Sequence, residues 1–217
     1  MPLIYKVIDS PQSTIAVWKV TETVEHLADQ LQLRIDSYER LSDMHPNRKM
    51  EWLASRNLIC SLLDDYDVSK IKNNSFGKPY HDDIDLNISI SHTTGFVAVY
   101  LSNKIIGIDI QQMTPKIKSI AHKFLDLNTL HHLHPTDNLE TIHYLWGAKE
   151  CMYKCYGRKK LDFKEHMKVS TEEFVGGDKK VIYPCITMGL ITKDLYQKEF
   201  AVLGVKINEV LLVYAHD

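Results

Sequence analysis

The sequence contains few cysteines and no cysteine motif. The four cysteines of this 217-residue chain are irregularly spaced and include no CxxC pair; they are Cys60, Cys151, Cys155 and Cys185. This spacing matches neither a structural zinc site nor the disulfide framework of a small secreted protein. We therefore expect reduced thiols, most of them buried.

Long apolar runs and a strong charge imbalance are also missing. The start, MPLIYKVIDS, lacks the apolar segment of a signal peptide, and no later run approaches the roughly 20 apolar residues of a membrane span. The 26 basic and 28 acidic residues leave a formal net charge of −2, which gives no global attraction to nucleic acid or to an anionic membrane. We expect a cytoplasmic protein with neither of these partners, in which phosphate is bound by a local cluster of basic residues.

Helix and strand patterns alternate along the chain. Apolar residues at helical spacing follow Pro46 as far as Leu63, and a second helical pattern runs from Glu140 to Tyr156, where Gly157 ends it. Between them, LNISIS and FVAVYL are separated by the turn-like HTTG. The simplest topology is a hairpin that continues into IIGIDI.

The order of these patterns predicts an α+β fold. The tail from 167 to 213 has mainly strand patterns, so both halves of the chain combine a helix with a β-hairpin. We expect a pseudo-twofold pair of similar α+β lobes, residues 1–102 and residues 103–217. Two lobes in one chain also favour a monomer.

The stretch IIGIDIQQM, residues 105 to 113, places an acid inside an apolar strand. A lone buried carboxylate is costly unless it is paired or binds a cation. Strand alternation puts Asp109 and Gln111 on one face, and Ile108 and Ile110 on the other. Two neighbouring oxygen-bearing side chains suit one hard cation.

The helix that contains LWGAKECMYKCYG carries two different stripes. Its apolar stripe comprises Leu145, Ala148, Met152 and Cys155. Trp146, Glu150 and Lys154 follow at i, i+4 and i+8 on another side. Taken alone, Glu150 and Lys154 have the ordinary interpretation of a solvent-exposed ion pair, which is worth only about 0.3 to 0.5 kcal/mol.

The ordered set GKP, ISISH, GIDI and W-x-x-K-E-x-x-x-K resembles the surfactin-type 4′-phosphopantetheinyl transferase superfamily. The resemblance runs from about residue 46 to 170. It implies a protein that moves the phosphopantetheine arm of coenzyme A onto a serine hydroxyl of an acyl or peptidyl carrier protein and releases 3′,5′-ADP. It also implies that Mg²⁺ bridges the pyrophosphate and that coenzyme A lies between two lobes.

The resemblance assigns roles to residues. For the metal, Asp109 and Glu150 match family ligands, and Gln111 stands where many members have a second acid. Catalysis is assigned to Glu150 and to Lys154, which adds a fixed cation near the transferred phosphoryl group. Lys149 offers a second cation, although a surface lysine is its simpler interpretation. The positions that match contacts with coenzyme A are Arg48, Arg56, Lys78, Pro79, Ser91, His92 and Lys154.

Two departures from the family pattern bear on activity. The amide of Gln111 brings no charge, so Mg²⁺ affinity should be lower than with an acid. Leu130 lies where many relatives carry a glutamate that acts as general base, and leucine cannot accept a proton. Glu150 is our first choice as its replacement, and the alternatives are Asp126, His131 and His132.

These departures keep two rival functions open. The first is a catalytically degenerate relative that binds coenzyme A or a carrier protein. The second is a metal-dependent phosphohydrolase, which would use the same acids on water. The HHLH stretch, 131 to 134, also raises the possibility of a separate metal site, but a polar loop is the simpler interpretation.

Overall fold

The computed structural model describes residues 2–10, 12–31, 41, 43–63, 67, 70–133, 139–171 and 183–217. Two antiparallel sheets, a short hairpin and two long helices make up most of this part of the chain. The predicted α+β fold class is therefore confirmed.

The first sheet has four strands in the order β1-β2-β6-β5, and all of its pairs are antiparallel. Helix α3 packs on one face of this sheet, and the shorter α1 packs beside α3. Pro46 is pre-organised for the first helical turn, and α3 begins there and ends one residue before the predicted limit. The elements are β1 (Leu3–Ser10), β2 (Ser13–Lys19), α1 (Val24–Gln30), α3 (Pro46–Leu62), β5 (Asn87–Thr93) and β6 (Phe96–Ser102).

A two-stranded hairpin precedes β5. Its strands are β3 (Ile71–Asn73) and β4 (Pro79–His81). The side-chain oxygen of Asn74 accepts hydrogen bonds from the backbone N–H groups of Phe76 and Lys78, at 2.9 and 3.0 Å. Gly77 has φ +92°, a conformation that favours glycine. These contacts and the backbone conformation of Gly77 hold the GKP sequence in a well-defined turn.

The second sheet has five strands in the order β7-β11-β10-β9-β8. Helix α6 packs on it with the predicted apolar stripe and ends before Gly157, which has φ +64°. The elements of this half are β7 (Ile106–Gln112), α4 (Ile117–Ile120), the 3₁₀ turn η2 (Ala121–Lys123), α5 (Leu127–His132), α6 (Leu139–Tyr156), β8 (Met167–Val169), β9 (Cys185–Lys193), β10 (Tyr196–Ile207) and β11 (Val210–His216).

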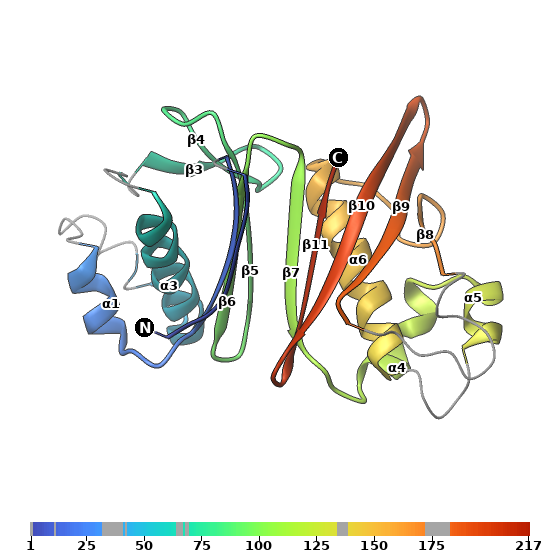
Figure 1. Ribbon diagram of the computed structural model, residues 1–217, viewed down its shortest axis with the longest axis horizontal. Helices are drawn as coiled ribbons and strands as arrows, with labels where there is room; N and C mark the ends of the chain where they lie inside the picture. Colours follow the sequence, from blue (N-terminus) through green and yellow to red (C-terminus); the bar gives the residue numbers. More distant parts are fainter. Residues whose placement is uncertain are drawn as a thin grey trace.

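The two sheets pack face to face, which gives four layers in the order helix, sheet, sheet, helix (Figure 1). One core lies under α3 and another lies under α6. The central core joins the sheets and includes Val17, Tyr100, Ile108, Ile110 and Leu212. Alternate residues of β2, β6, β7 and β11 contribute apolar side chains to this layer. Their packing determines how the two halves of the molecule meet.

The predicted continuation of the β5–β6 hairpin into β7 is wrong. β7 pairs with β11 along its whole length and belongs to the second sheet. The isoleucines of β7 pack against the first sheet through their side chains. The backbone of β7 forms its strand pairing with β11, at the end of the chain. The change of sheet falls between Ser102 and Ile106, whereas the division into two lobes at residue 102 stays a prediction about domains.

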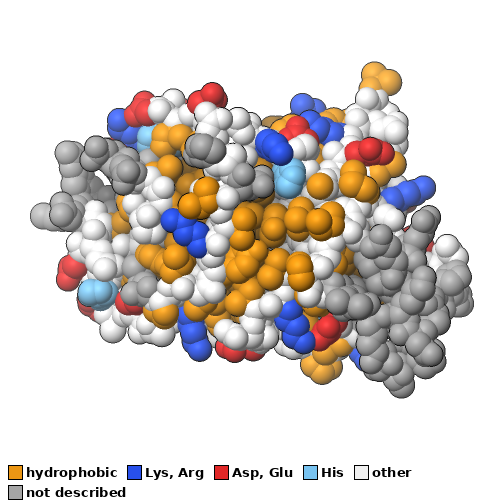
Figure 2. Space-filling view, viewed as in Figure 1, with side chains coloured by type: hydrophobic (Ala, Val, Ile, Leu, Met, Phe, Trp, Pro, Cys, Tyr) orange, Lys and Arg blue, Asp and Glu red, His pale blue; other side chains and the backbone are white. Residues whose placement is uncertain are grey.

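The surface is mixed in character. Figure 2 shows hydrophobic side chains gathered in the middle of one face, over the region where the two sheets meet, with charged side chains around them. Within the residues that the structure describes, no helix combines the length and apolar character needed to cross a membrane.

Candidate active site

Strand β7 turns its polar residues toward α6. Ile108 and Ile110 belong to the core between the sheets, so Asp109 and Gln111 project from the opposite face, as the alternation predicts. A Cβ atom on Gly107 would lie 2.0 Å from the backbone oxygen of Cys151 in α6. Glycine at position 107 is therefore required for α6 to approach β7 this closely.

Asp109 is 9% exposed, and neighbouring groups compensate its burial. Its Oδ1 accepts a hydrogen bond from Ser91 Oγ at 3.1 Å and lies 3.4 Å from Lys154 Nζ. Its Oδ2 accepts from Gln111 Nε2 at 3.1 Å. The carboxylate therefore has a hydroxyl, an amide and an ammonium group as partners, which explains how a strand interior tolerates it.

Two serines of β5 hold β7 in place from the neighbouring sheet. Ser89 Oγ accepts from the Ile108 N–H, and Ser91 Oγ accepts from the Ile110 N–H, both at 3.1 Å. The N–H groups of Ile108 and Ile110 thus bond to side chains across the gap between the sheets. Ser91 reaches both this backbone group and Asp109, so it fixes the carboxylate relative to β5.

Glu150 of α6 interacts with Asp109 electrostatically. Burial raises the pKa of Glu150, the negative charge of Asp109 raises it further, and the positive charge of Lys154 opposes this rise. Two acids with one lysine nearby leave an excess of negative charge in a partly buried place. This donor set fits a hard divalent cation, which carboxylate oxygens bind well.

The cation site would not be complete from acids and histidines alone. In the described part of the chain, no group of three or more His, Cys, Asp or Glu side chains is arranged to hold a metal ion. Mg²⁺ normally completes its shell with water and substrate phosphate oxygens. The two carboxylates therefore suit a metal that binds together with a phosphate ligand.

The side-chain amide of Gln111 is enclosed by polar groups. Its Nε2 donates to Asp109 Oδ2 and to the backbone oxygen of His143, both at 3.1 Å. Its Oε1 lies 2.5 Å from His143 Nδ1. In this orientation the amide nitrogen faces Asp109, while the predicted metal-binding oxygen faces His143.

The two lysines on α6 have different surroundings. Lys154 Nζ donates to the backbone oxygen of Ile108 at 2.6 Å and lies beside Asp109. Lys149 is 4% exposed, which corrects its interpretation as a surface lysine. Its Nζ donates to the backbone oxygens of Phe124, Phe163 and Met167 at 2.8, 2.6 and 2.9 Å. Lys149 therefore ties the backbone at Phe124, at Phe163 and at the start of β8 to α6.

A cavity of about 350 Å³ brings together the predicted nucleotide contacts of the first half. It lies between α3 and the turn of the β3–β4 hairpin, and Arg48, Arg56, Pro79 and His92 line it. Arg48 is exposed and Arg56 is buried. Such a cavity, open to solvent and lined by two arginines and a histidine, suits a phosphate-bearing ligand.

Packing orients two of these basic side chains. The Arg56 guanidinium lies 4.5 Å from the ring centroid of Trp52, and its Nη1 donates to Ser55 Oγ at 3.0 Å. His92 Nδ1 lies 3.2 Å from a carboxylate oxygen of Glu51. Both contacts are made by residues of α3, so this helix shapes the cavity and also holds the groups that line it.

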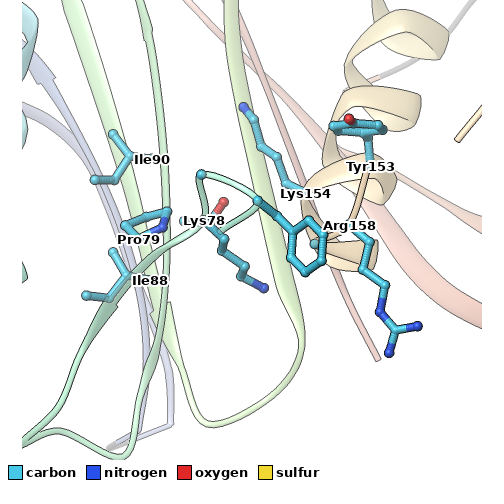
Figure 3. Close-up of a pocket in the computed structure, with 11 residues that line it drawn as sticks. Lys78, Pro79, Ile88, Ile90, Tyr153, Lys154 and Arg158 are labelled. Carbon is cyan, nitrogen blue, oxygen red and sulfur yellow. The ribbon is translucent and has the colours of Figure 1, made fainter. Parts of the chain in front are cut away.

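A second cavity, of about 190 Å³, lies on the other side of the GKP turn. Lys78, Pro79, Ile88 and Ile90 line it from the first half, and Tyr153, Lys154 and Arg158 line it from the end of α6 and the residues after it (Figure 3). Burial lowers the pKa of Lys78. Pro79 borders both cavities, and Lys154 connects this one to Asp109.

The candidates for a general base differ in position. Leu130 packs against the core under α6. Asp126 caps α5, and although burial raises its pKa, hydrogen bonds from Thr129 outweigh that effect and leave the pKa below its usual value. The side chains of His131 and His132, and all of His134, lie outside the described residues. Among the described candidates, Glu150 has the environment of a base.

Sequence reasoning passed over three residues at this site. They are Glu51, Ser89 and His143, and their contacts cross between elements far apart in the sequence. The alternation of serine in ISISH was the available signal for Ser89, because alternate residues of a strand share one face. No comparable pattern marks His143, which is 3% exposed inside α6.

Known proteins that are similar to this chain include two 4′-phosphopantetheinyl transferases. No model of a known protein family matches the chain. It is 32% identical over 87 residues to a 4′-phosphopantetheinyl transferase of Bacillus subtilis, and the alignment covers 38% of this chain and 39% of that protein. It is 27% identical over 124 residues to the 4′-phosphopantetheinyl transferase gsp of Aneurinibacillus migulanus, with 56% and 52% covered. The chain thus spans about half, or less, of the length of the relatives it matches, and these matches support a likeness to the 4′-phosphopantetheinyl transferase superfamily.

Proposed function

We propose that this protein is a Mg²⁺-dependent 4′-phosphopantetheinyl transferase of the holo-carrier-protein synthase type. It moves the phosphopantetheine arm of coenzyme A to a serine of an acyl or peptidyl carrier protein and releases 3′,5′-ADP. The observation that carries this proposal is the meeting of Asp109, Glu150 and Lys154 next to cavities lined by basic residues. The carrier would serve fatty-acid, polyketide or peptide synthesis.

Coenzyme A binds across the two halves in this proposal. The nucleotide end lies in the cavity beside α3, where Arg56, Arg48 and His92 hold its phosphates and Pro79 borders it. Ser91 and Lys78 contact the phosphates or arm nearer to α6. The guanidinium of Arg56 is already oriented by Trp52, so little of its side-chain freedom is lost on binding.

Asp109 and Glu150 would hold the cation, and the amide oxygen of Gln111 would join them as a neutral third donor only if the amide turned from its observed orientation toward His143. When bound, Mg²⁺ supplies charge neutralisation to the pyrophosphate and orients it for attack. Lys154 stabilises negative charge on the leaving group, because its ammonium is fixed by the Ile108 carbonyl beside Asp109.

Glu150 receives the proton of the attacking serine. The serine oxygen forms a bond to the β-phosphorus, and the bond from that phosphorus to the bridging oxygen breaks to release 3′,5′-ADP. The raised pKa of Glu150 supports this role, because a base with a pKa nearer to neutral pH accepts a proton more effectively than an ordinary carboxylate.

Intact-mass measurement tests the proposal. Purified protein is incubated with an apo carrier protein, coenzyme A and Mg²⁺, and the carrier mass is followed with and without a chelator. Transfer predicts a metal-dependent gain of one phosphopantetheine on the carrier serine. A carrier with the serine changed to alanine is the matched control and should gain nothing.

The same assay separates the rival functions. Breakdown of coenzyme A without a gain in carrier mass would identify a phosphohydrolase. Binding of coenzyme A or carrier without either product would identify a catalytically degenerate relative, and both results would overturn the proposed transfer.

A further inference from the structure

The cavity beside α3 contains an acid that its basic lining does not lead one to expect. Arg48, Arg56 and His92 line this cavity and suit a phosphate-bearing ligand, and Glu51 is the one acid among the described residues that line it. A carboxylate in such a place repels an anionic ligand. Its presence therefore needs a physical explanation, and its contacts supply one.

Glu51 and His92 are partners of each other. A carboxylate oxygen of Glu51 lies 3.2 Å from His92 Nδ1, and the two side chains are 29% and 49% exposed. In the described part of the chain, neither side chain makes another hydrogen bond or ion pair. The carboxylate is thus directed at the imidazole and at neither arginine of the cavity.

This contact decides which ring nitrogen is left for a ligand. A carboxylate only accepts, so Nδ1 must carry a hydrogen and donate it to Glu51. Nε2 is then the nitrogen that can meet a ligand in the cavity that His92 lines. A phosphate oxygen also only accepts, so both bonds form together only when the ring carries a hydrogen on each nitrogen and is positively charged.

The pair connects two elements whose positions are fixed by packing. Helix α3 is anchored on the first sheet by buried residues that include Leu53, Ala54 and Leu58. His92 lies on β5, which is at the end of that sheet and pairs only with β6 within it. Glu51 therefore restrains a ring that is half exposed, and less of its freedom remains to be lost when a ligand binds.

We propose that Glu51 is a positioning residue that holds the His92 imidazole by Nδ1, so that Nε2 donates to a phosphate group in the cavity beside α3. The inference rests on the proposed function for the identity of that ligand, coenzyme A. The net effect on the anion is favourable. The charge-assisted bond from the held ring is direct, whereas solvent screens the repulsion from a carboxylate on the far side of the ring.

The sign of one substitution effect tests the inference. Binding of coenzyme A is measured by calorimetry without a carrier protein, and KM and kcat are measured by transfer to an apo carrier. Glu51→Ala removes a negative charge, yet we expect it to weaken coenzyme A binding about five- to tenfold. The KM for coenzyme A should rise accordingly, with little change in kcat.

His92→Ala completes a double-mutant cycle. Without the ring, Glu51 only repels the ligand, so adding Glu51→Ala to His92→Ala should tighten coenzyme A binding about twofold. A loss of affinity confined to the protein that retains His92 supports the inference. Tighter binding by the single Glu51→Ala variant, an equal loss in both backgrounds or no effect in the natural background would overturn it.

Two further variants separate position from charge. Glu51→Gln keeps an oxygen that accepts from Nδ1–H, so it should recover most of the affinity that Glu51→Ala loses. Asp82→Asn changes the net charge equally, but Asp82 is an exposed acid paired with Lys72 of β3, and coenzyme A should bind this control as well as before or slightly more tightly. Binding by Glu51→Gln that is no better than that by Glu51→Ala would contradict a role through the Nδ1 bond.

The same measurements distinguish this inference from the proposed function. Transfer to the carrier without the expected change of sign would overturn the role of Glu51 and leave the proposed function intact. Absence of coenzyme A binding to the natural protein would overturn both.

Discussion

The acid cluster and the nucleotide cavity are built in different ways. Asp109 has hydrogen-bond partners on both carboxylate oxygens and is nearly buried. In the cavity beside α3, Arg48 is exposed, and the His92 side chain is about half exposed at 49%. The cluster is therefore preorganised by the meeting of β5, β7 and α6, whereas the cavity is shaped mainly by one helix and a turn.

This difference suggests a division of labour. Groups that stabilise a transition state need fixed positions, because an error of about 1 Å is costly in rate. Groups that hold the far end of a substrate can retain solvent contact and some freedom. Substitutions in the acid cluster should thus affect kcat most, and substitutions around the cavity should affect KM.

The largest effect is expected for Glu150→Gln. The change removes a metal ligand and the proposed base while keeping the shape of the side chain, so transfer should fall by at least about 10³-fold. Intact-mass kinetics with an apo carrier would measure this loss. Because the variant also removes a buried charge that Asp109 repels, its thermal midpoint without Mg²⁺ should match or exceed that of the natural protein.

A folded Glu150→Gln protein with normal transfer would contradict the claim that the acid cluster is needed for the reaction. Asp126→Asn serves as the control, because Asp126 caps α5 and has a lowered pKa. Its transfer rate should stay close to normal, with only a modest loss of stability from the weaker cap.

Two arginines test the nucleotide cavity. Arg56 is buried against Trp52, so Arg56→Ala should raise the KM for coenzyme A by about 10- to 100-fold, with a smaller change in kcat. Arg48 is exposed, and Arg48→Ala should raise the KM only about threefold, an effect that added salt reduces. Arg56→Lys separates charge from bidentate geometry. Equal effects of the two alanine variants would contradict the expected difference between the buried Arg56 and the exposed Arg48.

The sequence predicted those parts of the fold and site that depend on local patterns. α3, α6 and the β5–β6 hairpin follow from apolar spacing and from turn residues such as Gly95 and Gly157. The placement of Asp109 opposite Ile108 follows from strand alternation. The ordered motifs also indicated the superfamily, because such a set is far more specific than any one of its pieces.

Contacts between distant segments were not predictable in the same way. The pairing of β7 with β11 joins residues about one hundred positions apart, and no local pattern specifies it. Lys149 looked like an exposed lysine, because the three carbonyls that hold it come from segments separate from its helix face. The contacts of His143 with Gln111 and Thr114 likewise join distant parts of the chain, and no local pattern predicts them.

Lys149 offers a test of burial outside the acid cluster. Burial lowers its pKa to about 8 from 10.5, so between these values the unfolded chain binds more protons than the folded one. Stability from this group should therefore rise as pH increases from 8 toward 10.5. Relative to Lys149→Met, the natural protein should gain about 2 to 3 kcal/mol of unfolding free energy over this window, measured by denaturant titration at several pH values. A gap that shrinks with pH would mean that the three carbonyls hold the ammonium form more strongly than burial disfavours it.

A moderate effect is expected for Gln111→Glu, which alters the acid cluster but keeps its other contacts. A carboxylate at this position supplies a charged ligand and one oxygen for His143 Nδ1–H, so Mg²⁺ should bind about tenfold more tightly by calorimetry. Gln112→Glu is the matched control, because Gln112 bonds to Thr94 on the other face of β7 and should leave the affinity unchanged. If both variants tightened binding equally, general negative charge on β7 would account for the gain, and a fixed position of residue 111 beside Asp109 would have no special role.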